Sequence, residues 1–285
     1  MTKEIVRKRI KMLAKMIVAQ TFFPVLFVIV LQMASTMLFS LLANEISARY
    51  FPKAVWQLGN FSFNYMFPLI SILINALLLP LHLGVAEFLQ LLIRGKKPPV
   101  SGIFHWFSDG EKLSVVFSYF LFTTVLTLVM TPLSDIPYQY INRIYFEVIA
   151  DLQNQIESGA TTFVVNPALF NWPVLALSGV LLFLGMLVSI RFVPIVYLLV
   201  DRPKEGAFAA AKRSWGLMKG HTWEYLILLL SFSGWYIALP FTFFLAGLYL
   251  LPYLHISIVI FVSYIQSDPI LQQNAKVTPE KEGGV

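Results

Sequence analysis

The feature that most constrains this chain is a series of apolar runs, each long enough to cross a lipid bilayer as a helix. Such a crossing takes about 20 mostly apolar residues for about 30 Å of hydrocarbon. Of the 285 residues, 58% are apolar and 13% are charged, against about half and about a quarter in an average soluble domain. One soluble core cannot bury this excess, so the sequence predicts an all-α, polytopic membrane protein. About six transmembrane helices are expected, at residues 16–43, 66–93, 113–132, 173–200, 225–245 and 248–265.

These spans define a single integral membrane domain over residues 1–265, followed by a polar tail over 266–285 that is expected to be disordered and cytoplasmic. The last two spans are separated by a turn expected near Gly247. The segments LLIRGKKPPVSGIFHWF and YLLVDRPKEGAFAAAKRSW share one order: a span end, a basic turn with proline, and an apolar interfacial stretch. This order suggests two related three-helix halves, although shared membrane constraints alone produce the same likeness.

Positive charge is distributed unevenly between the loops. Lysine and arginine gather before the first expected span, between the second and third, and between the fourth and fifth, whereas the alternate loops hold only Arg49, Lys53 and Arg143. Such an excess marks the cytoplasmic side, so both termini are expected in the cytoplasm. The net charge of +6 then reflects topology, with anionic lipid headgroups as its partner and no nucleic acid.

Two loops are expected to contain helices. Asp201 can cap an interfacial helix that has Pro203 in its first turn, ends at Gly220 and carries Trp215 as an aromatic anchor. The acidic loop over residues 134–171 has apolar residues at helical spacing between positions 141 and 156. That helix could cap the outer ends of the bundle, or serve as a docking surface or a lid.

Several motifs resemble one family. RSWGLMKGH at 213–221, LSFSGW at 230–235 and the Leu251-Pro252-Tyr253 step look like the signature of bacterial integral membrane proteins catalogued as domain of unknown function 975. The resemblance implies about six spans in a bacterial cell membrane and no established activity. It departs at residues 189–194, where a Gly-containing turn is expected, and it is weak in the N-terminal region. The family-signature and interfacial positions are Trp215, Met218, Lys219, Gly220, His221, Gly234, Trp235, Pro252 and Tyr253.

Two ionisable residues fall inside expected spans, where a charge is costly. Glu87 and Arg191 lie at comparable distances from the cytoplasmic ends of their helices, so we predict an intramembrane ion pair between them, with Asn75 and His82 deeper on the same path. The pair could lock two helices together, each side chain could extend separately to the interface, or the pair could couple to a substrate.

Catalytic and metal motifs are not found in the sequence. The four histidines lack metal-ligand spacing, and His105 and His221 fit ordinary polar contacts better than a metal site. We therefore expect no enzyme, cofactor or metal.

Three functions fit these features. The first is a non-enzymatic accessory, envelope-stress or peptide-immunity type factor acting through a membrane protein partner or lipids. The second is a carrier or permease for a lipid or other amphiphile, to which the prolines within spans add support. The third is a lipid-active membrane enzyme.

Overall fold

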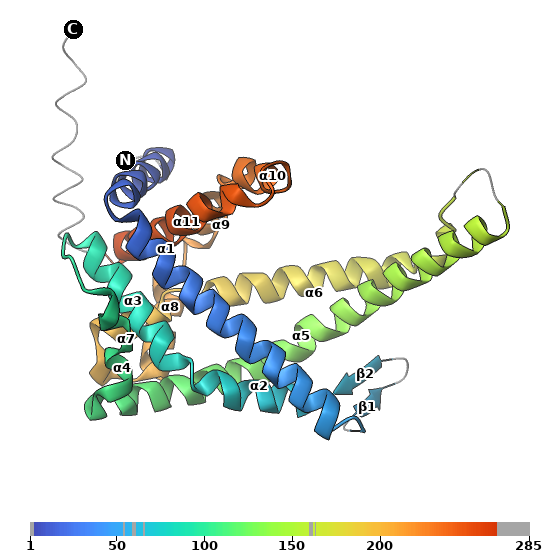
Figure 1. Ribbon diagram of the computed structural model, residues 1–285, viewed down its shortest axis with the longest axis horizontal. Coiled ribbons are helices and arrows are strands. Elements are labelled where there is room, and N and C mark those ends of the chain that lie inside the picture. Colours follow the sequence, from blue (N-terminus) through green and yellow to red (C-terminus); the bar gives the residue numbers. More distant parts are fainter. Residues whose placement is uncertain are drawn as a thin grey trace, which may run out of the picture. The chain divides into compact units, whose positions relative to one another are not determined.

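The fold is described from a computed structural model, for residues 3–53, 55–58, 61–64, 66–159, 162 and 164–266. The predicted tail over 266–285 lies outside these residues except for Gln266. Helices dominate, which confirms the all-α class, and the one addition is a short hairpin (Figure 1). In chain order the elements are α1 (Lys3–Tyr50), β1 (Val55–Leu58), β2 (Phe61–Asn64), α2 (Met66–Ala76), α3 (Leu79–Ile93), η1 (Val100–Phe104), α4 (His105–Ser108), α5 (Gly110–Glu157), η2 (Pro167–Leu169), α6 (Trp172–Ile190), α7 (Ile195–Asp201), η3 (Pro203–Glu205), α8 (Ala207–Leu217), α9 (Thr222–Leu230), α10 (Ser233–Phe241) and α11 (Leu245–Ile265).

Membrane-crossing helices occur in the number that the sequence predicts. Five are long and apolar enough to cross a bilayer, at Lys3–Tyr50, Lys112–Thr131, Trp172–Asp201, Thr222–Phe241 and Leu245–Ile265. The pair α2 and α3 makes a sixth if it counts as one span, with a bend of 52° between its helices. Pro80 follows this bend, in the first turn of α3. A proline fits there because backbone N–H groups in the first turn have no acceptor within the helix, so the absence of one costs no hydrogen bond.

The chain divides into two compact units, each with parts from distant stretches of sequence. The first comprises residues 1–43, 73–122 and 191–285, and the second residues 44–72 and 123–190. The prediction of one membrane domain over 1–265 is not tested by this division, because α1, α5 and the chain through residues 190–191 pass from one unit to the other.

Helix α3 forms the centre of the first unit. It contacts η1, α4, α7 and α11, and most of its residues are buried. Gly84 is the point of closest approach, because a Cβ atom there would lie 1.9 Å from the carbonyl oxygen of Ile103. Only glycine lets the backbone of η1 come this close to the helix, and Ile103 is fully buried as a result.

The second unit contains the hairpin and most of the loop between α5 and α6. Strands β1 and β2 pair antiparallel, with Val55 opposite Asn64 and Leu58 opposite Phe61. Gln155 on α5 binds the backbone of Val164 twice, by donating from Nε2 to the carbonyl at 2.8 Å and accepting from the amide at 3.0 Å. The Tyr140 hydroxyl binds the carbonyl of Asn171 at 3.1 Å. These bonds fold the loop back onto α5.

Two loop helices differ from the sequence predictions in their extent. The helix expected between positions 141 and 156 is present, but it continues α5 without a break through Pro132 and Pro137. A proline removes one helical hydrogen bond and need not end a helix. The interfacial helix α8 begins at Ala207, after Gly206 with a φ of 73°, so Asp201 does not cap it. Asp201 instead ends α7.

The last two spans also turn earlier than expected. α10 ends at Phe241, and Phe243 and Phe244 take positive φ values of 48° and 65° before α11 begins at Leu245. The Phe244 amide donates to the carbonyl of Leu239 at 2.8 Å, which closes the end of α10 as a left-handed cap does. The turn therefore lies near Gly247, as the sequence predicts, and is complete before that residue.

We expect Gly84→Ala to destabilise the first unit by about 3 kcal/mol or more, since the added methyl group would overlap backbone atoms that cannot rotate away. The thermal unfolding midpoint in detergent measures this. Gly216→Ala is the matched control, because it lies within α8 with open space around it and alanine favours a helix. Equal midpoints for the two variants would contradict the close packing at Gly84.

Candidate functional site

One face of α3 carries a polar group on each successive turn. Glu87, Gln90 and Arg94 follow the spacing i, i+3 and i+7, which places them along one side of a helix. The Glu87 carboxylate accepts a hydrogen bond of 2.6 Å from the indole Nε1 of Trp106. The ammonium of Lys112 lies 3.8 Å from the same oxygen and 4.8 Å from the Trp106 ring centroid. These contacts attach η1, α4 and the start of α5 to α3.

The other two residues of this face hold α7. Arg94 and Asp201 form an ion pair of 2.8 Å, and the Gln90 amide nitrogen donates to Asp201 at 3.2 Å and to the Tyr197 carbonyl at 3.1 Å. Gln90 is 1% exposed, so these bonds are formed away from water. We call Glu87, Gln90, Arg94, Trp106, Lys112 and Asp201 together the α3 polar cluster.

The predicted ion pair between Glu87 and Arg191 does not form. Glu87 is engaged within the α3 polar cluster, whereas the Arg191 guanidinium lies over the ring of Trp215, with its carbon 4.4 Å from the ring centroid. The prediction took both spans to be straight helices and placed Glu87 and Arg191 by their distances from the helix ends. Span four instead breaks after Ile190 in a turn over residues 191–194, which directs Arg191 toward α8. The other two residues expected on this path, Asn75 and His82, lie at the end of α2 and near the start of α3.

The family-signature residues close the turn before α9. Met218 is fully buried, and Gly220 takes a φ of 87°, a left-handed value that favours glycine. His221 Nδ1 lies 2.9 Å from the carboxylate of Glu224, which also accepts the Lys3 ammonium at 2.8 Å. Lys219, which precedes Gly220 in the signature, is exposed. His221 is thus placed by a carboxylate on α9 and a lysine from the start of α1.

The remaining signature residues pack α10 against α11. The ring of Trp235 lies 5.3 Å from that of Tyr249, and the ring of Tyr253, 1% exposed, lies 4.9 Å from that of Phe232. Pro252 is buried within α11. Gly234 has open space where a Cβ would lie, so its position needs no glycine for packing.

Lys11 makes a contact between distant elements that sequence reasoning missed. Its ammonium donates to the backbone carbonyl of Ser231 at 2.9 Å and lies 4.6 Å from the ring centroid of Phe232. Span five breaks between α9 and α10 at these two residues, and a break leaves helix carbonyls without partners. The ammonium supplies one partner. A serine followed by an aromatic residue within an apolar run was the only signal in the sequence.

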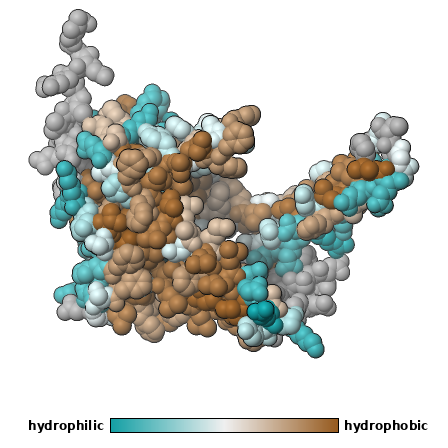
Figure 2. Space-filling view, viewed as in Figure 1, coloured by the Kyte–Doolittle hydropathy of each residue, from teal (hydrophilic) through white to brown (hydrophobic). Residues whose placement is uncertain are grey.

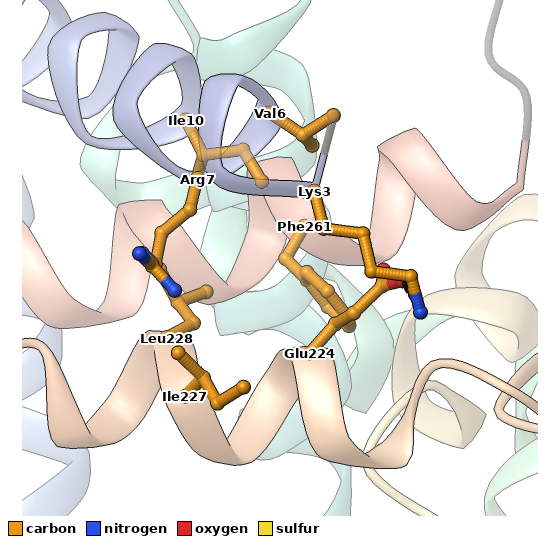
Figure 3. Close-up of a pocket in the computed structure, with 8 residues that line it drawn as sticks. All are labelled: Lys3, Val6, Arg7, Ile10, Glu224, Ile227, Leu228 and Phe261. Carbon is orange, nitrogen blue, oxygen red and sulfur yellow. Dashed lines mark ion pairs between the residues drawn. The ribbon is translucent and has the colours of Figure 1, made fainter. Parts of the chain in front are cut away.

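A small pocket lies where α1, α9 and α11 meet (Figure 3). Lys3, Arg7 and Glu224 line it together with apolar side chains, and Figure 3 shows Arg7 reaching from α1 toward Ile227 and Leu228. Its volume of about 40 Å³ is close to the space of one water molecule.

The histidines make separate contacts. His105 Nδ1 lies 2.8 Å from the Lys112 ammonium, and His255 Nδ1 lies 2.9 Å from the Leu251 carbonyl of its own helix. No group of three or more histidine or acidic side chains that could hold a metal ion occurs in the part of the chain that the structure describes.

The family comparison agrees with the resemblance seen in the motifs. A family model with the description "Protein of unknown function (DUF975)" matches residues 3–268. The match includes the N-terminal region, where the motifs alone show little likeness. No curated protein and no solved structure matched the chain.

We expect Arg94 and Asp201 to be coupled by about 1–2 kcal/mol in a double-mutant cycle of Arg94→Gln and Asp201→Asn. Their side chains are 24% and 21% exposed, between the exposed pairs that contribute little and the buried pairs that contribute more. The free energy of unfolding in detergent gives the coupling.

The control for this cycle is the pair Arg143 and Glu147, whose side chains are 56% and 37% exposed on one helix. A coupling of at most about 0.5 kcal/mol is expected there. A coupling between Arg94 and Asp201 no larger than the control would contradict a structural role for the pair.

Proposed function

We propose, for a chain that belongs to the DUF975 family of proteins of unknown function, a non-enzymatic role in a cell membrane, exerted through lipids or a protein partner. Proteins with such a role include accessory, envelope-stress and peptide-immunity type factors. The observation that carries this proposal is that carboxylates near the span ends pair with side chains of the protein, whereas many apolar side chains are exposed.

Three carboxylates near the span ends join elements. Asp201 is held by Arg94 and Gln90, Glu87 by Trp106 and Lys112, and Glu224 by Lys3 and His221. A general acid or base must be able to reach a substrate proton, and these carboxylates are directed at structural partners. This use of charge supports a role in binding rather than in catalysis.

The apolar side chains, in contrast, are largely uncovered. In the most apolar windows of α6 and α11, 11% and 50% of the residues are buried, so α6 turns most of its surface outward. Figure 2 shows brown, hydrophobic side chains over much of the face that is turned toward the viewer, across which Figure 1 draws α1. The exposed residues of α1 include Phe23, Phe27, Met33, Met37 and Leu41. Lipid tails or an apolar partner must cover such faces.

A carrier for a lipid or other amphiphile is the second candidate. Broken spans are frequent where transporters bind their cargo, and the α2 and α3 pair is bent by 52°. An apolar hollow of about 560 Å³ lies beside this bend, lined by Ala76 and by residues between Gly110 and Phe120 on α5. Its volume and lining suit part of an acyl chain.

Crosslinking in the native membrane, followed by purification and mass spectrometry of bound proteins and lipids, tests both candidates. We expect a protein partner in stoichiometric amount or a selectively retained lipid. A single amphiphile without a partner, followed by its transport into liposomes, would favour the carrier. A small-molecule product formed by the purified protein would contradict a non-enzymatic role.

The proposed topology can be tested directly, because the chain has no cysteine. Tyr145 is 59% exposed and lies in the loop expected outside, whereas Lys204 is exposed between spans four and five. A membrane-impermeant maleimide should label Tyr145→Cys in intact cells and Lys204→Cys only after permeabilisation. The reverse pattern would place both termini outside.

A further inference from the structure

Arg191 directly follows α6, a helix that is by itself nearly as long as the hydrocarbon layer is thick. The 19 residues of α6 rise about 28 Å at 1.5 Å per residue, which is nearly the thickness of the hydrocarbon layer. Trp172 begins this helix with an exposed ring, and tryptophan is enriched at membrane interfaces. The candidate span continues through α7 to Asp201, but if Trp172 lies at one interface, the length of α6 alone brings Arg191 to the level of the headgroups on the other side.

Helix α8 holds Arg191 at two points. The Ser214 hydroxyl donates to the Arg191 carbonyl at 2.7 Å, and the guanidinium carbon lies 4.4 Å from the ring centroid of Trp215. Trp215 in turn contacts the ring of Phe192 at 5.5 Å. Ser214 is fully buried, whereas Trp215 remains 41% exposed. The side chain of Arg191 is therefore oriented by packing that is open on one side.

This stacking leaves the hydrogen-bonding edge of the guanidinium available. A guanidinium stacked on an aromatic ring uses its face, and its N–H donors point outward in the plane. Within the described residues, the Arg191 side chain has no ion pair and no hydrogen bond. The two carboxylates of the segment between α7 and α8 have other partners, since Glu205 binds Arg202 and Arg213 at 3.1 and 3.0 Å, and Asp201 binds Arg94.

We propose that Arg191, stacked on Trp215, binds the phosphate of a phospholipid headgroup. The planar fork of a guanidinium matches two phosphate oxygens at once, and the half-exposed ring of Trp215 suits the headgroup level. Phe208 on the same helix is 56% exposed and contacts the ring of Phe122, which also contacts Phe192 next to Arg191. This exposed aromatic surface on α8 fits an amphiphile rather than a free ion. This site rests on the lipid branch of the proposed function and gives that branch a location.

Native mass spectrometry of the full-length, delipidated protein, titrated with phosphatidylglycerol, tests the site. We expect the first bound lipid to lose about tenfold in apparent affinity in Arg191→Gln, and to lose less in Arg191→Lys, which keeps the charge without the fork. Lys212→Gln is the matched control, since it removes one exposed positive charge from α8 and should leave the affinity unchanged. Equal losses in Arg191→Gln and Lys212→Gln would overturn the site in favour of diffuse surface charge.

Further measurements separate the remaining outcomes. Displacement of the lipid by millimolar inorganic phosphate would show a free-phosphate site and overturn the lipid assignment. Trp215→Leu keeps every charge and should lower the affinity for the lipid several-fold. This variant tests the site even if Arg191→Gln fails to fold. An unchanged affinity in Trp215→Leu would overturn the stacked geometry. If the wild-type protein binds no phospholipid but still captures a protein partner, the site is wrong and the proposed function stands.

Discussion

The close contact between α3 and the backbone of η1 is the constraint on which the rest of the first unit depends. Gly84 lets Ile103 pack directly onto the helix, and this places Trp106 within reach of Glu87. The next turns of the same helix face then meet α7 through Gln90 and Arg94. A side chain at position 84 would separate these elements, and the α3 polar cluster could not form as one set of bonds.

Satisfying polar groups where spans are interrupted is a second theme of the structure. The chain turns at residues 191–194 in span four and at 231–232 in span five, and a helix that ends in a turn leaves backbone groups without helical partners. At each break another element brings a donor: the Ser214 hydroxyl binds the Arg191 carbonyl, and the Lys11 ammonium binds the Ser231 carbonyl. Interrupted spans are tolerated here because neighbouring helices complete their hydrogen bonding.

Charge is divided between structure and surface. The carboxylates of Glu87, Asp201 and Glu224 join elements of the first unit. A net charge of +6, large apolar faces and aromatic rings at the span ends are the features on which the proposed binding of lipids or a membrane protein partner rests.

The sequence by itself determined the helical class, the number of spans and the family, because apolar run length and short signature motifs are local properties. It also indicated the helix over 141–156 and the glycine turn at 220. Only the tertiary structure decided the partners of Glu87 and Arg191, the continuity of α5 and the role of Lys11. Each depends on how a helix bends or breaks and on which residues far along the chain then come within hydrogen-bonding distance, and hydropathy carries neither kind of information. Trp106 and Glu87 are 19 positions apart, and Lys11 and Ser231 are 220 apart.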